Sequence, residues 1–497
     1  MKYVIGVDLG TSAVKALLVD RNGHVVHEAS ASYPLFHEQS GYSEQRPEDW
    51  VTGTMDVMKQ LLDMGSVKAE DIDGISFSGQ MHGLVLLDAS HQVLRNAILW
   101  NDTRTTQQCR QIEDRLGPML LDTARNAALE GFTLPKLLWV KEHEPEIYAQ
   151  ADVFLLPKDY VRYRMTGHIA QEYSDAAGTL LLDVANKRWS SAICNVVGVE
   201  ERLCPPLVES HDFVGYVTAD FAAATGLSVH TKVFAGGADN ACGAIGAGIL
   251  SDGKAMCSIG TSGVILSYEE NKALPVAGKV HFFNHAQQDA YYAMGVTLAA
   301  GYSLQWFHDT FCETQSFPEM LSGLASTDVG AKGLLFTPYL VGERTPHPDA
   351  NIRGSFIGMD ASHTQEHFTR AVIEGITFSL RESLDILRDA GKHIPMMISI
   401  GGGAKNETWL QIQADVFDAE IVRLTSEQGP GMGAAMLAAH GCGWFESLEA
   451  CANEFLRPAQ RYQPNPENVA KYNQLYRLYQ QVYDQTKVLS ESLAAFR

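Results

Sequence analysis

The chain has 497 residues, of which 45% are hydrophobic and 20% are charged, and its formal net charge is −21. This composition is that of an ordinary globular protein, and the acidic balance argues against nucleic acid and acidic membrane surfaces as partners. Any bound polyanion must be attracted locally, by backbone amides, a metal ion or a few cations. No apolar run approaches the about 18 residues of a transmembrane helix, so no membrane span is predicted.

The cysteines and the N-terminus indicate the compartment. The eight cysteines form no CxxC pair, and none is spaced with histidines as in a zinc finger. They are therefore expected to be reduced, buried thiols. The first apolar run, in "MKYVIGVDLG", stops at Asp8 and does not resemble a signal peptide. We therefore expect a cytoplasmic protein.

Secondary structure in the first half begins with a strand-rich segment. Residues 3–9 and 13–19 are apolar, and the Asn22-Gly23 turn leads into another β-rich run, which predicts three antiparallel strands. A helix is predicted to start near Pro47. Further strands are expected in the apolar runs at 74–79, 84–88, 152–157 and 232–237.

The second half repeats this pattern. Strands are expected at 255–260, 263–268, 290–295 and 395–400, and a helix at roughly 363–390. Ser362 and Gln365 suggest a capping box for that helix, and Gly391 a left-handed end. "GPGMGAA" at 429–435 predicts a closely packed helix start rather than a dinucleotide site. The last helix should begin at Asn465-Pro466, with tyrosines 472, 476, 479 and 483 forming a packing face.

Two Gly-Thr-Ser turns give the organisation of the chain. Residues 10–12 and 260–262 lie 250 apart (260 − 10), and in each case an apolar run enters the turn and another leaves it. Backbone amides and hydroxyls in such turns can bind an oxyanion, and two facing turns could hold a polyphosphate from both sides. A tight turn without a ligand is the alternative. The repeat predicts an α/β protein with mixed sheets and two domains, 1–246 and 247–497.

Two aspartates and a third glycine turn are candidates for chemistry. Asp8 stands at a strand end beside the first turn, where a carboxylate can hold Mg²⁺ directly or through water. Asp239, in "FAGGADNACGAIGAG", follows an apolar strand and two glycines, and can act as a general base or cap the following helix. "SIGGGAKNETW" at 399–409 can bind phosphate or nucleoside, or be a simple tight turn.

Longer motifs resemble a known family. "DLGTSAVKALL", "GQMHG", "ILWNDTR", "AGGADNACGAIG", "SIGTSGV", "PYLVGERTPH" and "IGGGAKNETW" occur in this order, and the chain is similar to the FGGY carbohydrate kinases nearly from end to end. Segments 131–145 and 354–375 resemble that family's two signature regions. The resemblance implies two actin-like, ribonuclease-H-like domains with mixed sheets flanking a deep catalytic cleft.

The resemblance also implies an activity. Family members transfer the γ-phosphoryl group of ATP to a sugar, and "GQMHG" with "LVGERTPH" is most similar to members acting on D-xylulose, which would give D-xylulose 5-phosphate. Asp239 would deprotonate the sugar hydroxyl and Asp8 would position Mg²⁺. Sugar contacts match Met81, His82, Trp100, Asp102, Asp239 and Asn240. ATP contacts match Gly10, Thr11, Ser12, Lys15, Gly260, Thr261, Gly301, Gln305, Gly402, Gly403, Ala404 and Asn406.

Other functions stay open from the sequence. The same chemistry could act on another ketose, a sugar acid or a polyol, such as ribulose, gluconate or glycerol. An actin- or Hsp70-like ATPase without a small-molecule acceptor would explain the repeated turn, but not "GQMHG" or Asp239-Asn240. A sugar-binding regulator without activity is disfavoured by the presence of both Asp8 and Asp239. The resemblance suggests a homodimer, while the chain itself indicates no oligomeric state.

Overall fold

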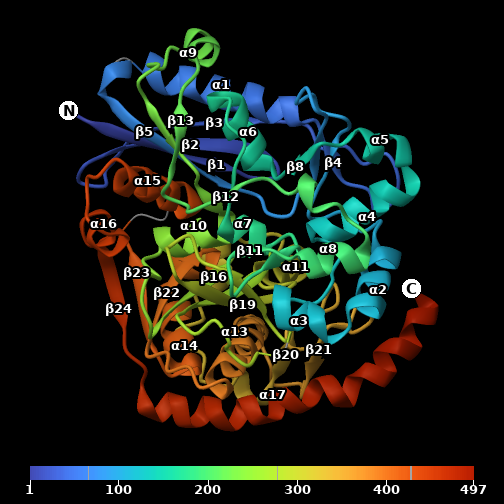
Figure 1. Cartoon of the computed structure of the whole chain (residues 1–497). Coiled ribbons are helices and arrows are strands. Elements are labelled where there is room, and N and C mark those ends of the chain that lie inside the picture. Colours follow the sequence, from blue (N-terminus) through green and yellow to red (C-terminus); the bar gives the residue numbers. More distant parts are fainter. Residues whose placement is uncertain (65–66, 277, 426–427) are drawn as a thin grey trace.

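The structure, a computed structural model, describes residues 1–64, 67–276, 278–425 and 428–497. Figure 1 shows two sheets, one in each half of the molecule, with α10 and α15 between them. No helix in the described ranges is both long and apolar enough to cross a bilayer. All eight cysteines are present as free thiols.

The first sheet comes from the N-terminal half. Its order in the described chain is β13-β14-β5-β1-β2-β3, with β15 pairing beside β5. β1, β2 and β3 are consecutive antiparallel strands, as predicted, and β1 is parallel to β5. The strands are β1 (Tyr3–Leu9), β2 (Ala13–Asp20), β3 (Val25–Ser32), β5 (Ile72–Gly79), β13 (Phe213–Tyr216), β14 (Lys232–Phe234) and β15 (Gly237–Ala238).

The second sheet repeats this topology. Its order is β18-β19-β17-β16-β22-β23-β24, so a meander (β16, β17, β19) again lies beside parallel strands (β22, β23) and ends on an antiparallel edge. The repeated turn is therefore the first hairpin of each sheet. The strands are β16 (Lys254–Ile259), β17 (Gly263–Glu269), β18 (His281–Asn284), β19 (Tyr291–Thr297), β22 (Met396–Gly401), β23 (Glu420–Leu424) and β24 (Pro458–Tyr462).

A mainly helical segment leaves the first sheet after β5 and returns at β13. It includes short strands paired in small sheets, and it forms the part of the N-terminal half shown in cyan and green in Figure 1. Its helices are α2 (Thr106–Leu116), α3 (Pro118–Ala124), α4 (Thr133–His143), α5 (Pro145–Gln150), α6 (Pro157–Thr166), α7 (Tyr173–Ala177) and α8 (Ser191–Val197). Its strands are β6 (Val85–Leu87), β7 (Ala97–Ile98), β8 (Val153–Leu155), β9 (Gln171–Glu172), β10 (Leu182–Asp183), β11 (Arg188–Trp189) and β12 (Leu207–Val208).

Amphipathic helices cover the sheets. α1 (Pro47–Asp63) starts at Pro47, as predicted, and packs Trp50, Val57 and Met58 into the core of the first sheet. In the C-terminal half, α17 starts at Pro466 with Asn465 as its cap, and Tyr472, Tyr476 and Tyr479 surround Phe378 of α13, which confirms the predicted packing face. The helices that pack around the two sheets after β13 include α9 (Ala219–Thr225), α10 (Asp239–Gly246), α11 (Gly301–Phe311), α13 (Gln365–Asp389), α14 (Glu407–Phe417), α15 (Gly429–Gly441), α16 (Leu448–Phe455) and α17 (Pro466–Leu493).

The predicted cap of α13 was wrong by two residues. Thr364 is the cap, and it makes a reciprocal capping box with His367 rather than Ser362 with Gln365. The Ser362 hydroxyl instead donates to Asp360 Oδ1 at 2.6 Å, which holds it in the preceding turn. The other end agrees with the prediction: Gly391 has a φ of +96°, and Lys392 N–H donates to the Leu387 carbonyl in a Schellman-type end.

Glycines allow α15 to lie directly on β1 and α10. A Cβ on Gly6 of β1 would fall 2.0 Å from the Gly431 carbonyl oxygen, and one on Gly433 would fall 1.9 Å from the Cys242 carbonyl oxygen of α10. A Cβ on Gly246, at the end of α10, would lie 2.4 Å from the Gly429 carbonyl oxygen. α15 belongs by sequence to the second half of the chain, yet it packs on the first sheet.

This packing predicts a large cost for adding one methyl group. Gly433→Ala should destabilise the protein by at least about 2 kcal/mol, because the Cβ overlaps backbone atoms that cannot move aside. Gly243→Ala is the matched control on α10, since its Cβ would meet only Pro430 Cγ at 3.8 Å. Alanine favours the helix there by up to about 1 kcal/mol. Equal thermal melting midpoints for the two variants would contradict the close contact.

Candidate functional site

Asp8 and Asp239 lie at the carboxyl ends of β1 and β15, the two strands that flank the end of β5. Asp8 is in β1, and β5 pairs in parallel with both β1 and β15. In this register Asp8 is opposite Ser78, which is opposite Gly237, and Asp239 follows β15 directly. Two carboxylates that are far apart in the sequence therefore meet at one edge of the sheet.

The electrostatics of this pair favour protonation. Burial, and then the charge of Asp8, raise the pKa of the Asp239 carboxyl to about 7, although the Asn240 backbone N–H stabilises the ionised form. Burial also raises the pKa of Asp8, against the opposing effect of Lys15. Asp239 can therefore exchange a proton near neutral pH.

Asp239 does not cap its helix. α10 begins at Asp239 itself, its cap residue is Ala238, and the Asp239 carboxylate contacts its neighbour Asn240 through the backbone N–H at 2.7 Å and the side-chain amide at 3.0 Å. The capping alternative is therefore wrong. The Asn240 amide also lies 3.7 Å from Met81 Sδ, so the structure brings three expected sugar contacts together.

His82 is held as a neutral ring with a defined tautomer. Burial and the nearby Lys136 lower its pKa to about 3, and its Nδ1 lies 2.7 Å from the Gly178 carbonyl oxygen. A carbonyl only accepts, so Nδ1 carries the proton and Nε2 remains an acceptor. The ring packs on Phe132 at a centroid distance of 4.7 Å. Phe283, from the second sheet, lies 6.3 Å from it, so both halves enclose this residue.

Trp100 is exposed and could contact a ligand, whereas Asp102 is buried. The Trp100 ring is 44% exposed, and its Nε1–H donates to the Thr11 hydroxyl at 2.9 Å. Asp102 is buried, with its two oxygens bound by the Arg104 guanidinium at 2.9 and 2.7 Å and by the Ser43 N–H at 2.6 Å. In this structure Asp102 shapes the loop around Trp100 rather than facing open space.

The first Gly-Thr-Ser turn is tied to its surroundings. Tyr33 donates to the Gly10 carbonyl, and Gln45 donates to the Thr11 carbonyl at 2.7 Å. Ser12 is exposed. Lys15 Nζ lies 2.9 Å from Glu28 and 2.9 Å from Gln428, just before α15. Its ammonium group therefore links the first hairpin to the helix from the other half.

The second turn opens onto a cavity of about 690 Å³. Gly301 N–H donates to the Gly260 carbonyl at 2.9 Å, and a Cβ on Gly301 would lie 2.3 Å from that oxygen, so glycine is required for α11 to meet the turn. Asn406 caps α14 through the Trp409 N–H at 2.9 Å. The expected residues that line the cavity are Gly260, Thr261, Gly301, Gln305, Gly402, Gly403 and Asn406, whereas Ala404 is buried beneath it.

Sequence reasoning missed the apolar wall of this cavity. The additional lining residues are Ile259, Tyr302, Leu304, Phe317, Pro318, Leu321, Lys405 and Trp409. Most lie in or just before α11, α12 (Phe317–Leu321) and α14, where apolar side chains at helical spacing look like ordinary core positions. Only the folded chain shows that these side chains face a cavity with glycine turns on its other side.

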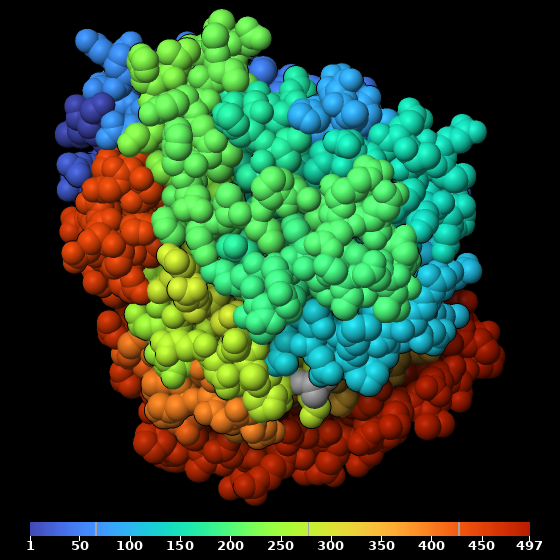
Figure 2. All heavy atoms as spheres, viewed as in Figure 1, coloured from blue at the N-terminus to red at the C-terminus, as the bar shows by residue number. Residues whose placement is uncertain are grey.

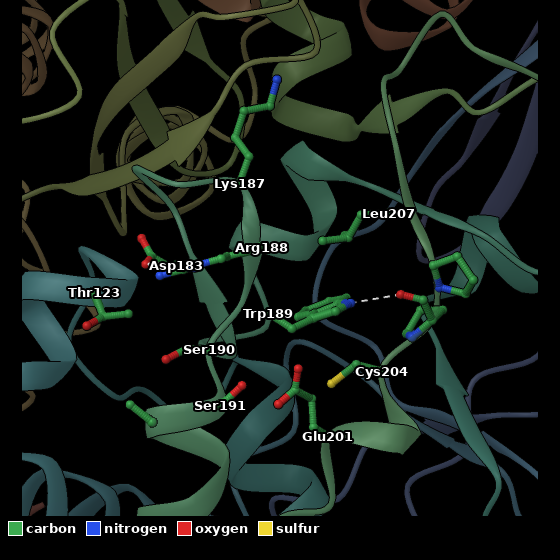
Figure 3. Close-up of a pocket in the computed structure, with 13 residues that line it drawn as sticks. Thr123, Asp183, Lys187, Arg188, Trp189, Ser190, Ser191, Glu201, Cys204 and Leu207 are labelled. Carbon is green, nitrogen blue, oxygen red and sulfur yellow. Dashed lines mark hydrogen bonds and ion pairs between the residues drawn. The ribbon is translucent and has the colours of Figure 1, made fainter.

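A second cavity, of about 730 Å³, lies in the helical segment of the N-terminal half (Figure 3). The Trp189 side chain lines this cavity, and its indole N–H donates to the Pro205 carbonyl at 2.8 Å. Its wall carries both signs of charge, from Asp183, Arg188 and Glu201 among others. None of the expected site residues lines this cavity.

Comparison with known proteins places this geometry in a family. Residues 3–246 match the N-terminal domain, and residues 255–442 the C-terminal domain, of the FGGY family of carbohydrate kinases. The chain belongs to the FGGY family. A curated relative, the xylulose kinase of Bacillus subtilis (strain 168), is 62% identical over 497 residues, covering 100% of both chains.

Solved structures of FGGY kinases have the same fold. A ligand-bound xylulose kinase from Lactobacillus acidophilus has a TM-score of 0.93 and 27% identity, with 98% of this chain and 99% of that chain covered. A gluconate kinase from the same organism has a TM-score of 0.93, 27% identity and full coverage of both chains. The expected two-domain α/β fold and the sugar-kinase class are confirmed.

The raised pKa of Asp239 predicts a pH-dependent stability gain for Asp239→Asn. Between about pH 4 and 7 the folded state holds a proton that the unfolded state releases, so this residue's contribution to stability falls as pH rises through that window. Asparagine removes the cost of ionisation, which should be on the order of 2 kcal/mol for a half-buried group at pH 8, and near zero below pH 4.

Thermal melting midpoints measured from pH 4 to 8 test this expectation. Asp114→Asn, at an exposed position of α2, is the control for the substitution itself. A pH-independent shift for Asp239→Asn would show that the Asp239 carboxyl ionises normally.

Proposed function

We propose that the chain transfers the γ-phosphoryl group of ATP to D-xylulose, giving D-xylulose 5-phosphate, with Asp239 as general base. The observation that carries this proposal is the pair Asp8 and Asp239, at the ends of the two strands that flank β5, together with the raised pKa of Asp239, about 7. A base with a pKa of about 7 is mostly ionised at slightly alkaline pH and still basic enough to accept a hydroxyl proton.

The surroundings of Asp239 suit a polyhydroxyl ligand. The Asn240 amide can donate, His82 Nε2 can accept, and the exposed Trp100 ring offers a flat apolar face. Met81 lies against Asn240 and limits the space at that side. These groups offer both a hydrogen-bond donor and an acceptor close to Asp239, which supports assigning the sugar to this region.

The cavity beside the second turn suits a nucleotide. Tyr302, Leu304 and Leu321 provide an apolar wall for a base, while Gly402 and Gly403 allow backbone amides to approach phosphate. Thr261 adds a hydroxyl donor. The first turn and Lys15 would contact phosphates from the other side. This arrangement supports ATP as phosphoryl donor.

The carboxylates fit the Mg²⁺ that this family implies. Mg²⁺ is commonly held by one or two carboxylates together with substrate phosphates, rather than by a full protein cage. In agreement with this, no cluster of three or more His, Cys, Asp or Glu among the described residues could hold a metal ion. Asp8 would hold Mg²⁺, which, when bound, neutralises phosphate charge.

The proposal includes closure of two domains, 1–246 and 247–497. The duplicated sheets and the contacts of His82 with both halves support it. Closure would exclude water from the transferring group and thereby limit ATP hydrolysis. α15 is the exception within 247–497: it packs on β1 and α10 and would move with 1–246, so the contacts that change on closure lie elsewhere. A homodimer is supported by family resemblance alone, and a cytoplasmic location by the eight free thiols.

The identity of the sugar rests on sequence rather than on fold. The xylulose and gluconate kinase structures are equally similar to this chain, whereas 62% identity to a xylulose kinase over the full length favours xylulose. Ribulose, gluconate and glycerol remain the alternatives within the same chemistry. An ATPase without an acceptor is the alternative from another class.

ADP release with different acceptors tests the proposal. We expect kcat/KM for D-xylulose to exceed that for ribulose, gluconate and glycerol by at least about tenfold, because a hydrogen-bonding pocket discriminates strongly. Release without acceptor should be slow. Asp239→Asn should lower turnover by about 10²–10⁴-fold while still binding sugar. A fast acceptor-independent rate would favour the ATPase, and full turnover in the variant would place the base elsewhere.

Thr261→Val tests the nucleotide cavity. The change is nearly isosteric and removes one donor to phosphate, so KM for ATP should rise by roughly tenfold, with little change in KM for sugar. Thr52→Val, on the exposed side of α1, is the control. If Thr261→Val raised both KM values equally, the second turn would have a structural role only.

A further inference from the structure

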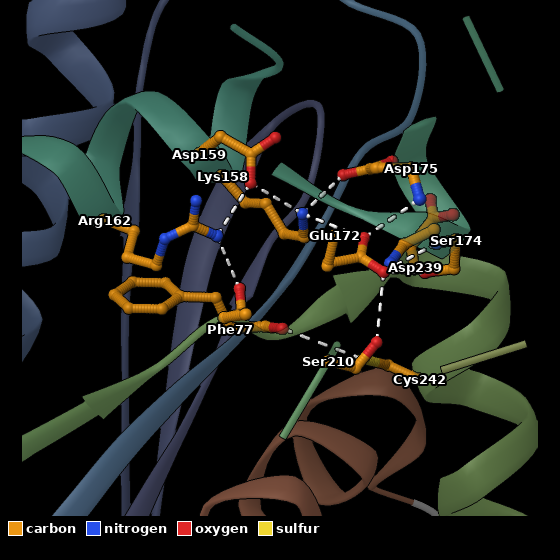
Figure 4. Close-up of polar contacts among 12 residues, drawn as sticks. Phe77, Lys158, Asp159, Arg162, Glu172, Ser174, Asp175, Ser210, Asp239 and Cys242 are labelled. Carbon is orange, nitrogen blue, oxygen red and sulfur yellow. Dashed lines mark hydrogen bonds and ion pairs between the residues drawn. The ribbon is translucent and has the colours of Figure 1, made fainter. Parts of the chain in front are cut away.

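Five charged side chains are completely buried next to the candidate base (Figure 4). Lys158 Nζ lies 2.9 Å from Asp159, 3.1 Å from Glu172 and 2.7 Å from Asp175, and Arg162 lies 2.8 Å from Asp159. We refer to these five residues as the buried charge cluster. Each has 0% exposure, and burying so many charges is costly unless they are paired and positioned.

The protonation state of the cluster follows from its charges. Asp175 has a pKa well above its ordinary value because of burial and of the neighbouring Glu172 and Asp159 carboxylates. Glu172 keeps a low pKa despite its burial, because of Lys158 and the hydrogen bonds it accepts. Glu172 is therefore ionised and can only accept hydrogen bonds.

This polarity determines the direction of the hydrogen bonds made by Ser174. The Ser174 hydroxyl donates to Glu172 Oε2 at 2.7 Å, because the carboxylate cannot donate. Its oxygen is therefore free to accept, and it accepts the Ala238 N–H at 2.9 Å. Ala238 is the residue immediately before Asp239. The chain of contacts thus runs from Lys158 through Glu172 and Ser174 to the backbone that carries the base.

The backbone on the N-terminal side of Ala238, at Ala235 and Gly236, is also held by hydrogen bonds. Arg162 donates to the Ala235 carbonyl at 2.6 Å, and Gly236 N–H donates to the Ser210 carbonyl at 2.9 Å. Ser210 also donates its hydroxyl to Glu172 Oε2, at 3.1 Å. Ser174 and Ser210 therefore share one acceptor oxygen, but only the Ser174 side chain contacts the residue before Asp239.

We propose that Ser174 is a positioning residue for Asp239, with its hydroxyl oriented by Glu172 and Lys158. The proposal rests on the proposed function of Asp239 as general base. Ser174 touches neither substrate nor nucleotide in this scheme, and it acts only by fixing the backbone from which the Asp239 carboxylate projects. Small displacements of a catalytic group cost large factors in rate, up to about 10² for a shift of about 1 Å.

Steady-state kinetics of matched variants test this role. Ser174→Ala should lower kcat by at least about tenfold, with KM for ATP and for xylulose within about threefold of the wild-type values. Ser210→Ala removes a buried hydroxyl from the same Glu172 oxygen and should leave kcat within about threefold. Ser174→Thr keeps the hydroxyl and should recover most of the lost kcat. Thermal melting of each variant shows whether it is folded.

A double variant separates positioning from a general structural effect. In the Asp239→Asn background Ser174→Ala should cost nothing further, because the group that it positions is gone. Additive losses would overturn the proposal, as would equal losses in Ser174→Ala and Ser210→Ala, or an unfolded Ser174→Ala. If Asp239→Asn is impaired while Ser174→Ala is fully active, only the positioning role fails. If Asp239→Asn is fully active, the proposed base itself is wrong.

Discussion

The close contact of α15 with β1 and α10 is the constraint on which the site depends. Asp8 is the penultimate residue of β1, α10 begins with Asp239, and glycines in these elements let α15 approach both closely. Because these contacts join backbone atoms of α15 to those of β1 and α10, no change of side-chain rotamer can relieve them or alter them. The sheet register brings the two carboxylates to one edge, and a helix from the opposite half of the chain packs against the two elements that carry them.

This packing explains how strongly perturbed carboxylates can persist. Asp8 and Asp239 would repel each other if both were ionised, and burial adds to that cost. A loosely packed site would relax by moving them apart or by admitting water. Here the strands and α15 pack closely around the two elements, so both carboxyls stay buried and burial raises the pKa of each. The unfavourable free energy of two buried, neighbouring carboxylates is relieved when a cation binds them or a proton is transferred to one of them.

The two Gly-Thr-Ser turns occupy equivalent places in the two sheets but differ in their surroundings. The first spans Gly10 to Ala13, between Leu9 and its strand partner Val14, and is tied to Tyr33, Gln45 and Trp100. The second is one residue shorter and borders an open cavity. Duplication accounts for their likeness. Their surroundings differ because polar and aromatic side chains contact the first turn, whereas helices α11 and α14 lie beside the second.

The sequence by itself determined the local elements and the candidate residues. The apolar runs at 3–9 and 13–19, the Asn22-Gly23 turn and Pro47 are local signals, so they predicted the hairpins and the start of α1 correctly. "GPGMGAA" likewise predicted a tightly packed helix start. Tertiary structure alone decided which sheet α15 covers, that Arg104 binds Asp102, and that Tyr302 and Leu321 face a cavity. These outcomes depend on contacts between segments far apart in the chain, and a local sequence pattern does not show which distant segment a residue will contact.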